Sequence, residues 1–457
     1  MDLLIKNGIL VTPTDCFKAD IGVDEGKIVA ISSKMPAEAD DVVDAKGKYV
    51  LPGGIDPHTH MEMPFMGATT VDDFEYGTIA AAFGGVTTII DFAIQPKDKT
   101  FLETIALWKA KADPKVVTDY ALHVAVTNLT EDLIKEIPDV QKAGVQSFKL
   151  FMPYRKEGLM SDDGRIFRML EESRKLNFLV QLHAENNSIL EMLIERNVNA
   201  GKLSAEYHAK SRPNYCEGEA INRGLAMAHA TNGNLYIVHM STKEGLMELR
   251  RWKAMGANVF GETCPHYLVL NDEKYFSSKG RRYIMSPPLR SKADNEALWE
   301  GILDYSFDTV GTDHCTFTDA QKDLGKDNFT KVPNGVPGVE TMIPLLYTEG
   351  VKRKRMSINR LVEVTALNSA KLFGLYPRKG TLNIGSDADI VIFDPDFELQ
   401  LSRENLHSKI DYSIYEEFKV KGMPTYTFVR GKPVVYNREY VGKKGSGRYV
   451  PATKPQF

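Results

Sequence analysis

The stretch Tyr49-Val50-Leu51-Pro52-Gly53-Gly54-Ile55-Asp56-Pro57-His58-Thr59-His60 joins an apolar, glycine-rich run to two histidines. Residues i and i+2 of an extended segment point to the same face, so the imidazoles of His58 and His60 project together. Imidazole is the commonest metal-binding side chain. The stretch therefore predicts a strand whose end opens into a metal site, with Asp56 either orienting one ring or forming a structural turn.

Seven further apolar runs follow, and the segments between them have helical character. The runs span residues 85–92, 119–126, 145–151, 178–185, 235–240, 259–266 and 309–315. With the strand that leads into His58 they make eight strands that alternate with helices. This order predicts an α/β protein with a (β/α)8 TIM barrel, in which active sites lie at the C-terminal ends of the strands.

The two ends of the chain have a different pattern, in which short apolar runs alternate with turns. Asp24-Glu25-Gly26 between two such runs is typical of a β-hairpin, and similar runs recur at residues 388–394 and 425–435. We expect residues 1–52 and 377–457 to form one β-sandwich domain with a C-terminal tail. Residues 53–376 would then form the barrel.

The composition of the 457 residues excludes several classes of protein. A hydrophobic fraction of 43% with 26% charged residues is ordinary for a globular enzyme, and it excludes disordered and fibrous chains. The formal charge of −4 gives no basic surface for nucleic acid or an anionic membrane. The chain has no apolar run of about 18 residues and no basic leader, so we expect a cytoplasmic protein with a small-molecule partner.

The four cysteines have no paired spacing that would indicate a metal or redox motif, so we interpret them as reduced thiols. They are Cys16, Cys216, Cys264 and Cys315.

Several predicted strands end on a polar side chain that can bind a metal or take part in chemistry. Besides His58 and His60, these residues are Lys149, His183, His239 and Asp313. Taken singly, each has a structural explanation, since strand-end histidines often form hydrogen bonds and lysines extend to solvent. Because all of them would gather at the same end of one barrel, we interpret them as one functional site.

The pattern Gly-x-x-Asp-x-His-x-His from Gly53 to His60, followed by the strand-end lysine, two single histidines and a late aspartate, resembles the amidohydrolase superfamily. Within it, the chain resembles the cyclic amidohydrolases, the dihydropyrimidinases and D-hydantoinases, over essentially its whole length. Longer strings that carry this resemblance are Tyr-Ile-Met-Ser-Pro-Pro-Leu-Arg at 283–290, Val-Pro-Asn-Gly-Val-Pro-Gly at 332–338 and the run at 370–380.

The resemblance implies a binuclear zinc site with a modified lysine. His58, His60 and Asp313 would hold one zinc ion, His183 and His239 the other, and a carboxylated Lys149 would bridge both. An ammonium group cannot bind a cation, whereas a carbamate offers two oxygens. Its formation needs the neutral amine, which burial and nearby positive charge favour. Cobalt or manganese would accept the same ligands.

The resemblance also implies an activity, the hydrolysis of hydantoins or dihydropyrimidines to N-carbamoyl amino acids. A metal-bridging hydroxide would attack the ring amide, with Asp313 acting as base and then as acid. Tyr154 would donate to the oxyanion, and main-chain groups of Ser286 and Asn334 would bind the cyclic amide.

Four apolar residues would line the pocket, although core packing explains them equally well. They are Met63, Phe65, Phe151 and Leu159. Pro153 stands where we expect a small residue in this family, and it would stiffen the rim of the pocket.

Three alternatives stay open. Allantoinase and dihydroorotase belong to the same superfamily, and a dihydroorotase would need basic pocket residues, for which Arg155 and Arg290 are the nearest candidates. A non-catalytic scaffold, as in the collapsin-response mediator proteins, is disfavoured because all six ligand positions are filled.

The family implies a homotetramer, in which residues 443–450 would reach a neighbouring subunit or form a disordered tail.

The remaining histidines carry less weight. His266 would be either a partner of the ligands or structural, and His314 should point away from the metals. The histidines that we interpret as structural or exposed are His123, His208, His229 and His407.

Overall fold

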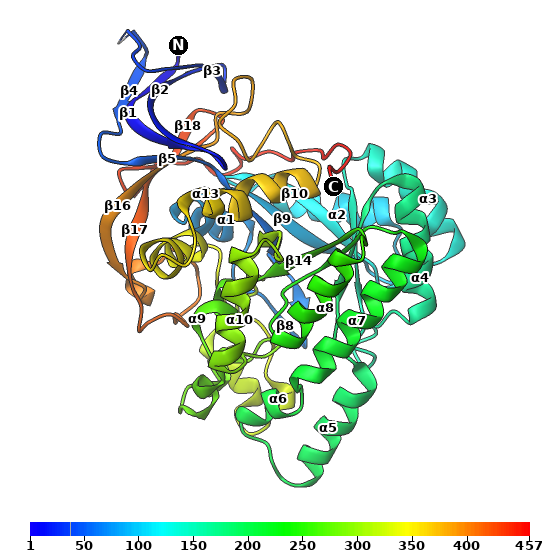
Figure 1. The fold of residues 1–457 in the computed structure, drawn as a ribbon. Helices are drawn as coiled ribbons and strands as arrows, with labels where there is room; N and C mark the ends of the chain where they lie inside the picture. The colour runs from blue at the N-terminus through cyan, green and yellow to red at the C-terminus, as the bar shows by residue number, and fades with distance from the viewer. Residues whose placement is uncertain (37) are drawn as a thin grey trace.

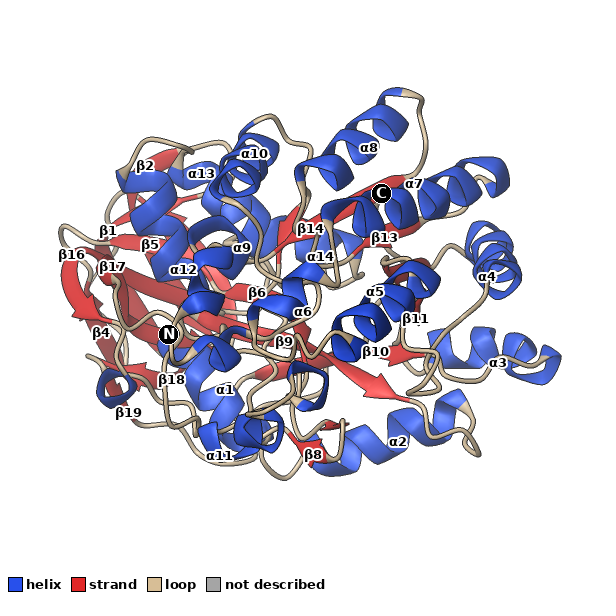
Figure 2. Ribbon diagram, turned by 90° about the horizontal axis from the view of Figure 1, so that it is seen from below, coloured by secondary structure: helices blue, strands red, loops and turns tan. Residues whose placement is uncertain are grey.

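The computed structural model describes residues 1–36 and 38–457. Most of its strands belong to two sheets, one of eight strands and one of nine (Figure 1). The eight-stranded sheet is the predicted barrel, and helices surround it when it is seen from below (Figure 2). The nine-stranded sheet draws its strands from both ends of the chain. The predicted fold class is therefore confirmed.

All neighbouring strands of the barrel are parallel, in the order β15-β14-β13-β12-β11-β10-β9-β6. The strands are β6 (Gly54–Thr59), β9 (Val86–Ile94), β10 (Asp119–Ala125), β11 (Ser147–Phe151), β12 (Leu179–His183), β13 (Leu235–Ile237), β14 (Val259–Thr263) and β15 (Thr309–Val310). The segment after β15 completes the ring, because His314 forms a parallel bridge with Thr59 of β6.

Several barrel strands are shorter than the sequence predicts, and three of them end at least three residues early. The strand expected at 259–266 ends at Thr263, because Pro265 opens helix α9 (Pro265–Val269), where its missing N–H is tolerated. The strands expected at 235–240 and 309–315 end at Ile237 and Val310. Beyond those ends, His239 and Asp313 have positive φ angles of 39° and 50°, which an extended ladder cannot accommodate.

The helices around the barrel pack on it through apolar faces. In α3 (Glu131–Lys142), the buried residues Leu133, Ile134, Ile137 and Val140 follow helical spacing. Thr100 caps the N-terminus of α2 (Phe101–Ala112) through a capping box with Glu103. No helix within residues 1–36 and 38–457 is both long enough and apolar enough to cross a membrane.

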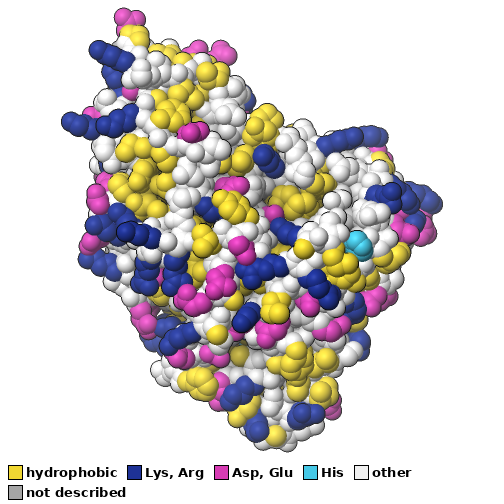
Figure 3. All heavy atoms as spheres, viewed as in Figure 1, with side chains coloured by type: hydrophobic (Ala, Val, Ile, Leu, Met, Phe, Trp, Pro, Cys, Tyr) yellow, Lys and Arg dark blue, Asp and Glu magenta, His cyan; other side chains and the backbone are white. Residues whose placement is uncertain are grey.

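The remaining α-helices have the following bounds: α1 (Phe74–Phe83), α4 (Asp163–Leu176), α5 (Asn187–Asn199), α6 (Glu206–Lys210), α7 (Asn214–Thr231), α8 (Lys243–Ala254), α10 (Lys292–Leu303), α11 (Asp319–Lys322), α12 (Met342–Leu345), α13 (Ile358–Val362) and α14 (Asn368–Leu372). Over the face drawn in Figure 3, basic and acidic side chains are intermixed rather than gathered by sign.

The second sheet joins the two ends of the chain through β5 (Tyr49–Pro52). This strand pairs with β1 (Leu3–Val11) on one side and with β16 (Ile390–Gln400) on the other. The predicted hairpin is present between β2 (Cys16–Asp24) and β3 (Lys27–Ser32). Its two turn residues, Glu25 and Gly26, have φ angles of 47° and 75°, as a two-residue hairpin turn requires.

The other strands of this sheet are β4 (Asp41–Asp44), β17 (Lys419–Val429), β18 (Lys432–Tyr436) and β19 (Glu439–Tyr440), and a small separate hairpin contains β7 (Pro64–Phe65) and β8 (Ala68–Thr69).

The C-terminal residues 443–450 pack against the barrel of their own chain. Arg448 accepts a hydrogen bond from the Tyr120 N–H at 3.0 Å, and Val450 donates to the Tyr120 carbonyl at 2.7 Å. The segment thus runs beside β10 and is not a disordered tail. It could leave its own barrel only by breaking these hydrogen bonds.

A buried ionic cluster joins the barrel to the terminal sheet. The Lys379 Nζ lies 2.5 Å from a carboxylate oxygen of Asp119, at the start of β10, and 2.7 Å from one of Asp389, just before β16. Asp387 is 3.0 Å away, and its other oxygen pairs with the half-exposed Lys27. Lys379 and the three carboxylates are buried. The cluster therefore fixes where the two sheets meet.

Replacing Lys379 by methionine should strongly destabilise the fold. The change leaves buried carboxylates without their central cation, and breaking such a cluster costs roughly 3–5 kcal/mol. Urea denaturation measures the loss. Lys27→Met is the matched control, and it should cost less than about 1 kcal/mol because the Lys27 side chain is half-exposed and its ion pair is weakened by water. Equal losses of unfolding free energy in the two variants would show that the buried cluster stabilises the fold no more than an exposed ion pair does.

Candidate active site

The polar strand ends meet in one cavity at the C-terminal end of the barrel. The cavity measures about 570 Å³ including its open mouth. The predicted site residues that line it are His60, Met63, Phe65, Lys149, Phe151, Tyr154, Leu159, His183, His239, Ser286, Asp313 and Asn334. The remaining predicted residue, His58, lies beneath them, with its Nε2 3.1 Å from the Lys149 Nζ. The structure therefore brings the whole predicted set together.

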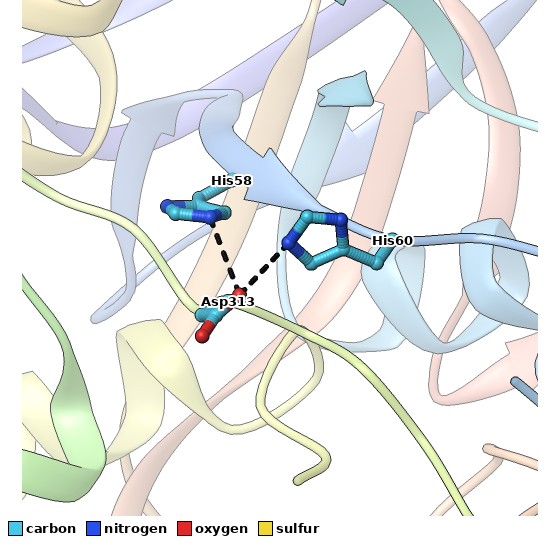
Figure 4. Close-up of side chains that lie close together, drawn as sticks. All are labelled: His58, His60 and Asp313. Carbon is cyan, nitrogen blue, oxygen red and sulfur yellow. Dashed lines mark ion pairs between the residues drawn. The ribbon is translucent and has the colours of Figure 1, made fainter. Parts of the chain in front are cut away.

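His58, His60 and Asp313 form a compact group that can hold a metal ion (Figure 4). One carboxylate oxygen of Asp313 lies 3.2 Å from the His58 Nε2 and 3.0 Å from the His60 Nε2. The donor atoms of the three residues all lie within 4.8 Å of one another. His58 lies in β6 and His60 directly after it, and the carboxylate comes from the segment after β15, so this group forms where the barrel closes.

A second group adjoins the first. The rings of His183 and His239 have centroids 4.5 Å apart, and the His239 ring stacks on His58 at 5.3 Å. Lys149 is almost completely buried beside His58. Burial lowers the pKa of Lys149 to about 8, so far more of its amine is neutral near pH 7 than in an ordinary lysine. This is the protonation state that carboxylation requires.

The protonation states also suit metal binding. Burial lowers the pKa of His58, His60, His183 and His239, which leaves neutral imidazoles. Burial alone would raise the pKa of Asp313, but the neighbouring His58 and His60 hold it well below its usual value. The Nδ1 atoms of His60 and His239 are buried without a hydrogen-bond partner within the described part of the chain. Unpaired nitrogens and an ionised carboxylate fit a divalent cation.

Two buried glutamates orient the histidine rings. A Glu262 oxygen lies 2.7 Å from the His58 Nδ1, which turns the His58 Nε2 toward Lys149 and Asp313. Glu185 lies 2.7 Å from the His183 Nε2 and pairs with Arg212 at 2.6 Å. Such outer partners fix the tautomer and the direction of a metal ligand.

Neither glutamate was predicted from the sequence. Glu185 follows His183 by two residues, so strand alternation was a signal that could have found it. Glu262 has no local signal, because it reaches His58 from β14. Asp56, considered for this role, instead accepts hydrogen bonds from the main-chain N–H groups of His58 and Thr312, so it is structural.

The site residues have an unusual backbone. Tyr154, His239 and Asp313 have φ angles of 71°, 39° and 50°, a region in which non-glycine residues are uncommon. Such conformations cost about 1–3 kcal/mol each and cluster at functional sites. His314 helps to hold Asp313, because its Nε2 lies 2.9 Å from Asp72 and its Nδ1 accepts from the Gly338 N–H at 3.1 Å. His314 therefore points away from the ligands, as predicted.

The opposite wall of the cavity offers groups for a substrate. Burial raises the pKa of Tyr154, so its hydroxyl stays protonated and can donate. The Tyr154 ring lies 5.2 Å from the His183 ring. Asn334 donates from its Nδ2 to the Ser286 Oγ at 2.8 Å, so the side chains of these two residues join their loops.

The four apolar residues predicted at the rim line the cavity and also pack in apolar clusters, so both explanations given for them hold. Cavity-lining residues that the sequence analysis missed are Phe92, Ile94, Ala125, Cys315 and Gly335.

The two arginines considered for binding the carboxylate of a dihydroorotase substrate lie outside the cavity. Arg290 is buried in an ion pair with Glu217 at 3.1 Å, and the exposed Arg155 pairs with Glu191 at 3.3 Å. Neither arginine lines the cavity, so neither is placed to bind a carboxylate there.

The remaining histidines lie outside the ligand groups. His266 lies in α9, and neither of its ring nitrogens has a hydrogen-bond partner among residues 1–36 and 38–457, so it orients no ligand. The others are structural: His123 contacts the Pro57 carbonyl, His208 the Met285 carbonyl, His229 the Trp252 ring and His407 the Glu340 carboxylate.

The model of the amidohydrolase family matches residues 49–434, which include the barrel and every residue of the site. The chain belongs to the amidohydrolase family.

Comparison with individual proteins narrows the class. The chain is 43% identical to a D-hydantoinase of Geobacillus stearothermophilus, over 99% of this chain and 97% of the relative. A dihydropyrimidinase structure from Brevibacillus agri NCHU1002 has 42% identity, covers 100% of both chains and gives a TM-score of 0.98. An L-hydantoinase (dihydropyrimidinase) structure from Arthrobacter aurescens has 33% identity, covers 98% of this chain and 99% of its own, and gives a TM-score of 0.91. Within its family, the chain is thus a cyclic amidohydrolase of the dihydropyrimidinase and D-hydantoinase group, and it hydrolyses cyclic amides.

Changing Glu262 to glutamine should weaken metal binding about 10–100-fold, the usual effect of losing an outer partner of a ligating histidine. Competition between the protein and a zinc chelator measures the affinity. The control is Asp389→Asn, which alters a buried carboxylate in the domain-joining cluster without touching a histidine, and it should leave zinc affinity unchanged. Unaltered affinity in the Glu262 variant would mean that this residue does not set the direction of the His58 ring.

Proposed function

We propose that this protein opens hydantoins or dihydropyrimidines to N-carbamoyl amino acids, with two zinc ions and a carboxylated Lys149 in each subunit. The observation that carries the proposal is the convergence of all six candidate ligands at one cavity. His58, His60 and Asp313 would hold one ion, and His183 and His239 the other, with Lys149 between them. When bound, the ions would lower the pKa of a water molecule and polarise the scissile carbonyl.

Asp313 is the proposed base and acid. Its carboxylate is ionised, and one of its oxygens faces His58 and His60. The other oxygen is available to take a proton from the attacking water and return it to the departing ring nitrogen. The left-handed backbone at Asp313, held by the hydrogen bonds of His314, keeps the carboxylate aimed at the cavity.

Tyr154 and two loops are proposed to hold the cyclic amide. The protonated Tyr154 hydroxyl would donate to the oxyanion that forms on the carbonyl oxygen. The main-chain N–H and C=O of Ser286 have no partner within the described residues, which leaves both for the ring amide. Asn334 lies beside Ser286, with its Nδ2 2.8 Å from the Ser286 Oγ, and its main-chain groups would contact the same edge of the substrate.

An assembly is also proposed from the family, and a location from the sequence. The proposed assembly is a homotetramer. The proposed location is the cytoplasm, which agrees with the four cysteines, all of which are free thiols.

The proposed reaction predicts a defined product. Dihydrouracil and racemic phenylhydantoin should both open, and activity should disappear after chelator treatment and return with zinc. Chiral chromatography of the phenylhydantoin product should show the D-carbamoyl amino acid, since several of the most similar relatives are named D-hydantoinase. If zinc-loaded protein opens neither ring, allantoin and dihydroorotate become the substrates to test, followed by the scaffold hypothesis.

Replacing Lys149 by alanine should lower both zinc content and kcat by more than about 100-fold, because even outer-shell changes cost about 10–100-fold. Acetate or propionate should restore part of the activity, because a small carboxylate supplies the two oxygens that the carbamate would provide. Lys156→Ala, which removes an exposed lysine near the cavity, is the control and should show neither effect. A fully active Lys149 variant would show that this lysine is not a ligand in the proposed metal site.

A further inference from the structure

A second buried lysine lies near the site, outside the proposed metal ligands. Lys322 ends the short helix α11, and its side chain is completely buried. Its Nζ lies 2.8 Å from each of three main-chain carbonyl oxygens, those of Ile284, Pro333 and Gly335. An ammonium group has three N–H donors, so the three acceptors satisfy it fully. Among the described residues, no carboxylate lies within ion-pair distance of Lys322.

The three carbonyls lie next to the two residues proposed to bind substrate. Ile284 precedes Ser286 by two positions, and Pro333 and Gly335 flank Asn334 on both sides. The loops also contact each other directly, because the Gly335 N–H donates to the Ile284 carbonyl at 3.0 Å. Lys322 is therefore the shared donor that fixes the two loops against one another.

Other buried groups hold the rest of the Ser286 loop. The Met285 carbonyl lies 2.7 Å from the His208 Nε2, and the Tyr267 hydroxyl donates to the Pro287 carbonyl at 2.6 Å. Burial lowers the pKa of His208 to about 3, so the ring is neutral and its Nε2–H donates. The carbonyls before and after Ser286 are thus occupied, while the main-chain groups of Ser286 itself stay free.

We propose that Lys322 is a positioning residue that holds the Ser286 and Asn334 loops at the spacing the cyclic amide requires. The proposal rests on the substrate-binding roles proposed above for Ser286 and Asn334. Burying a cation without a carboxylate is costly, and burial lowers the pKa of Lys322 to about 7. A buried methionine would avoid this cost but would leave the carbonyls without their common donor. Lys322 touches none of the proposed metal ligands, so it acts on substrate binding.

Lys322→Met tests the proposal in the zinc-loaded, full-length enzyme. The two loops would hold the amide in both the ground state and the transition state, so their loosening should raise KM with little effect on kcat. With dihydrouracil as the substrate, we expect KM to rise about 10-fold, the effect of losing roughly one hydrogen bond's worth of binding. Zinc content should stay unchanged. Lys379→Met, an equally buried lysine in the domain-joining cluster, should lower the urea midpoint without raising KM.

Hydrogen exchange of the ligand-free protein provides a readout that does not need activity. Peptides that cover residues 281–290 and 331–336 should exchange faster in Lys322→Met than in wild type or in Lys379→Met. Lys322→Arg keeps the charge, but its planar guanidinium cannot serve three converging carbonyls. It should therefore raise KM and exchange in the same direction, and it serves as the test if the methionine variant does not fold.

Two results would overturn the proposal in distinguishable ways. Unchanged exchange in both loops would show that Lys322 does not hold them. Faster exchange with an unchanged KM would show that the loops are held by Lys322 but do not bind the ring, so the roles proposed for Ser286 and Asn334 would be wrong. Faster exchange together with a raised KM supports the positioning role.

Discussion

The site depends on the closure of the barrel between its first strand and the segment after its last. Asp56 in β6 accepts a hydrogen bond from the Thr312 N–H at 3.0 Å, and the His60 N–H donates to the His314 carbonyl at 2.9 Å. These contacts join residues more than 250 positions apart, and they bring Asp313 against His58 and His60. Without this closure the chain would still have the same side chains at its strand ends, but the compact ligand group would not form.

The structure holds the ligands by ending its regular elements early. Beyond β13 and β15 the backbone turns into the left-handed region at His239 and Asp313, which points both side chains into the cavity. The conformational cost is offset by buried contacts: the His239 N–H donates to Glu262, and His314 is fixed by Asp72 and Gly338. Buried polar groups that are fully hydrogen-bonded rigidify their surroundings. The same Glu262 carboxylate serves His58 and His239 and so links the two proposed metal positions.

A feature of the structure could be predicted from the sequence when the residues that define it lie close together in the chain. The strand-end ligands were predictable because a polar residue after an apolar run is visible in the chain itself, and parallel strands bring such residues to one end. Glu262 and Lys322 were not predictable in this way, since their partners come from other parts of the chain. The shortened strands escaped prediction because a positive φ at a histidine or aspartate has no signature in composition. The packing of residues 443–450 depends on backbone hydrogen bonds to Tyr120, which carry no side-chain pattern.

The cavity has two parts that differ in how far their residues can be changed: the candidate metal ligands on the strand ends and the apolar wall. The ligands stand on strands whose register is set by the whole barrel, so a change there disturbs several residues at once. The apolar wall comes partly from a self-contained loop, in which the Ser161 N–H donates to the Phe151 carbonyl at 2.7 Å and the Leu159 N–H to the Tyr154 carbonyl at 3.1 Å. Pro153 fixes the backbone just before Tyr154. Solved structures named D-hydantoinase and L-hydantoinase both match the whole fold, with TM-scores of 0.97 and 0.91. Substitutions in residues 151–161 can therefore reshape the space for a ring substituent while the ligand geometry, set by barrel closure, is kept.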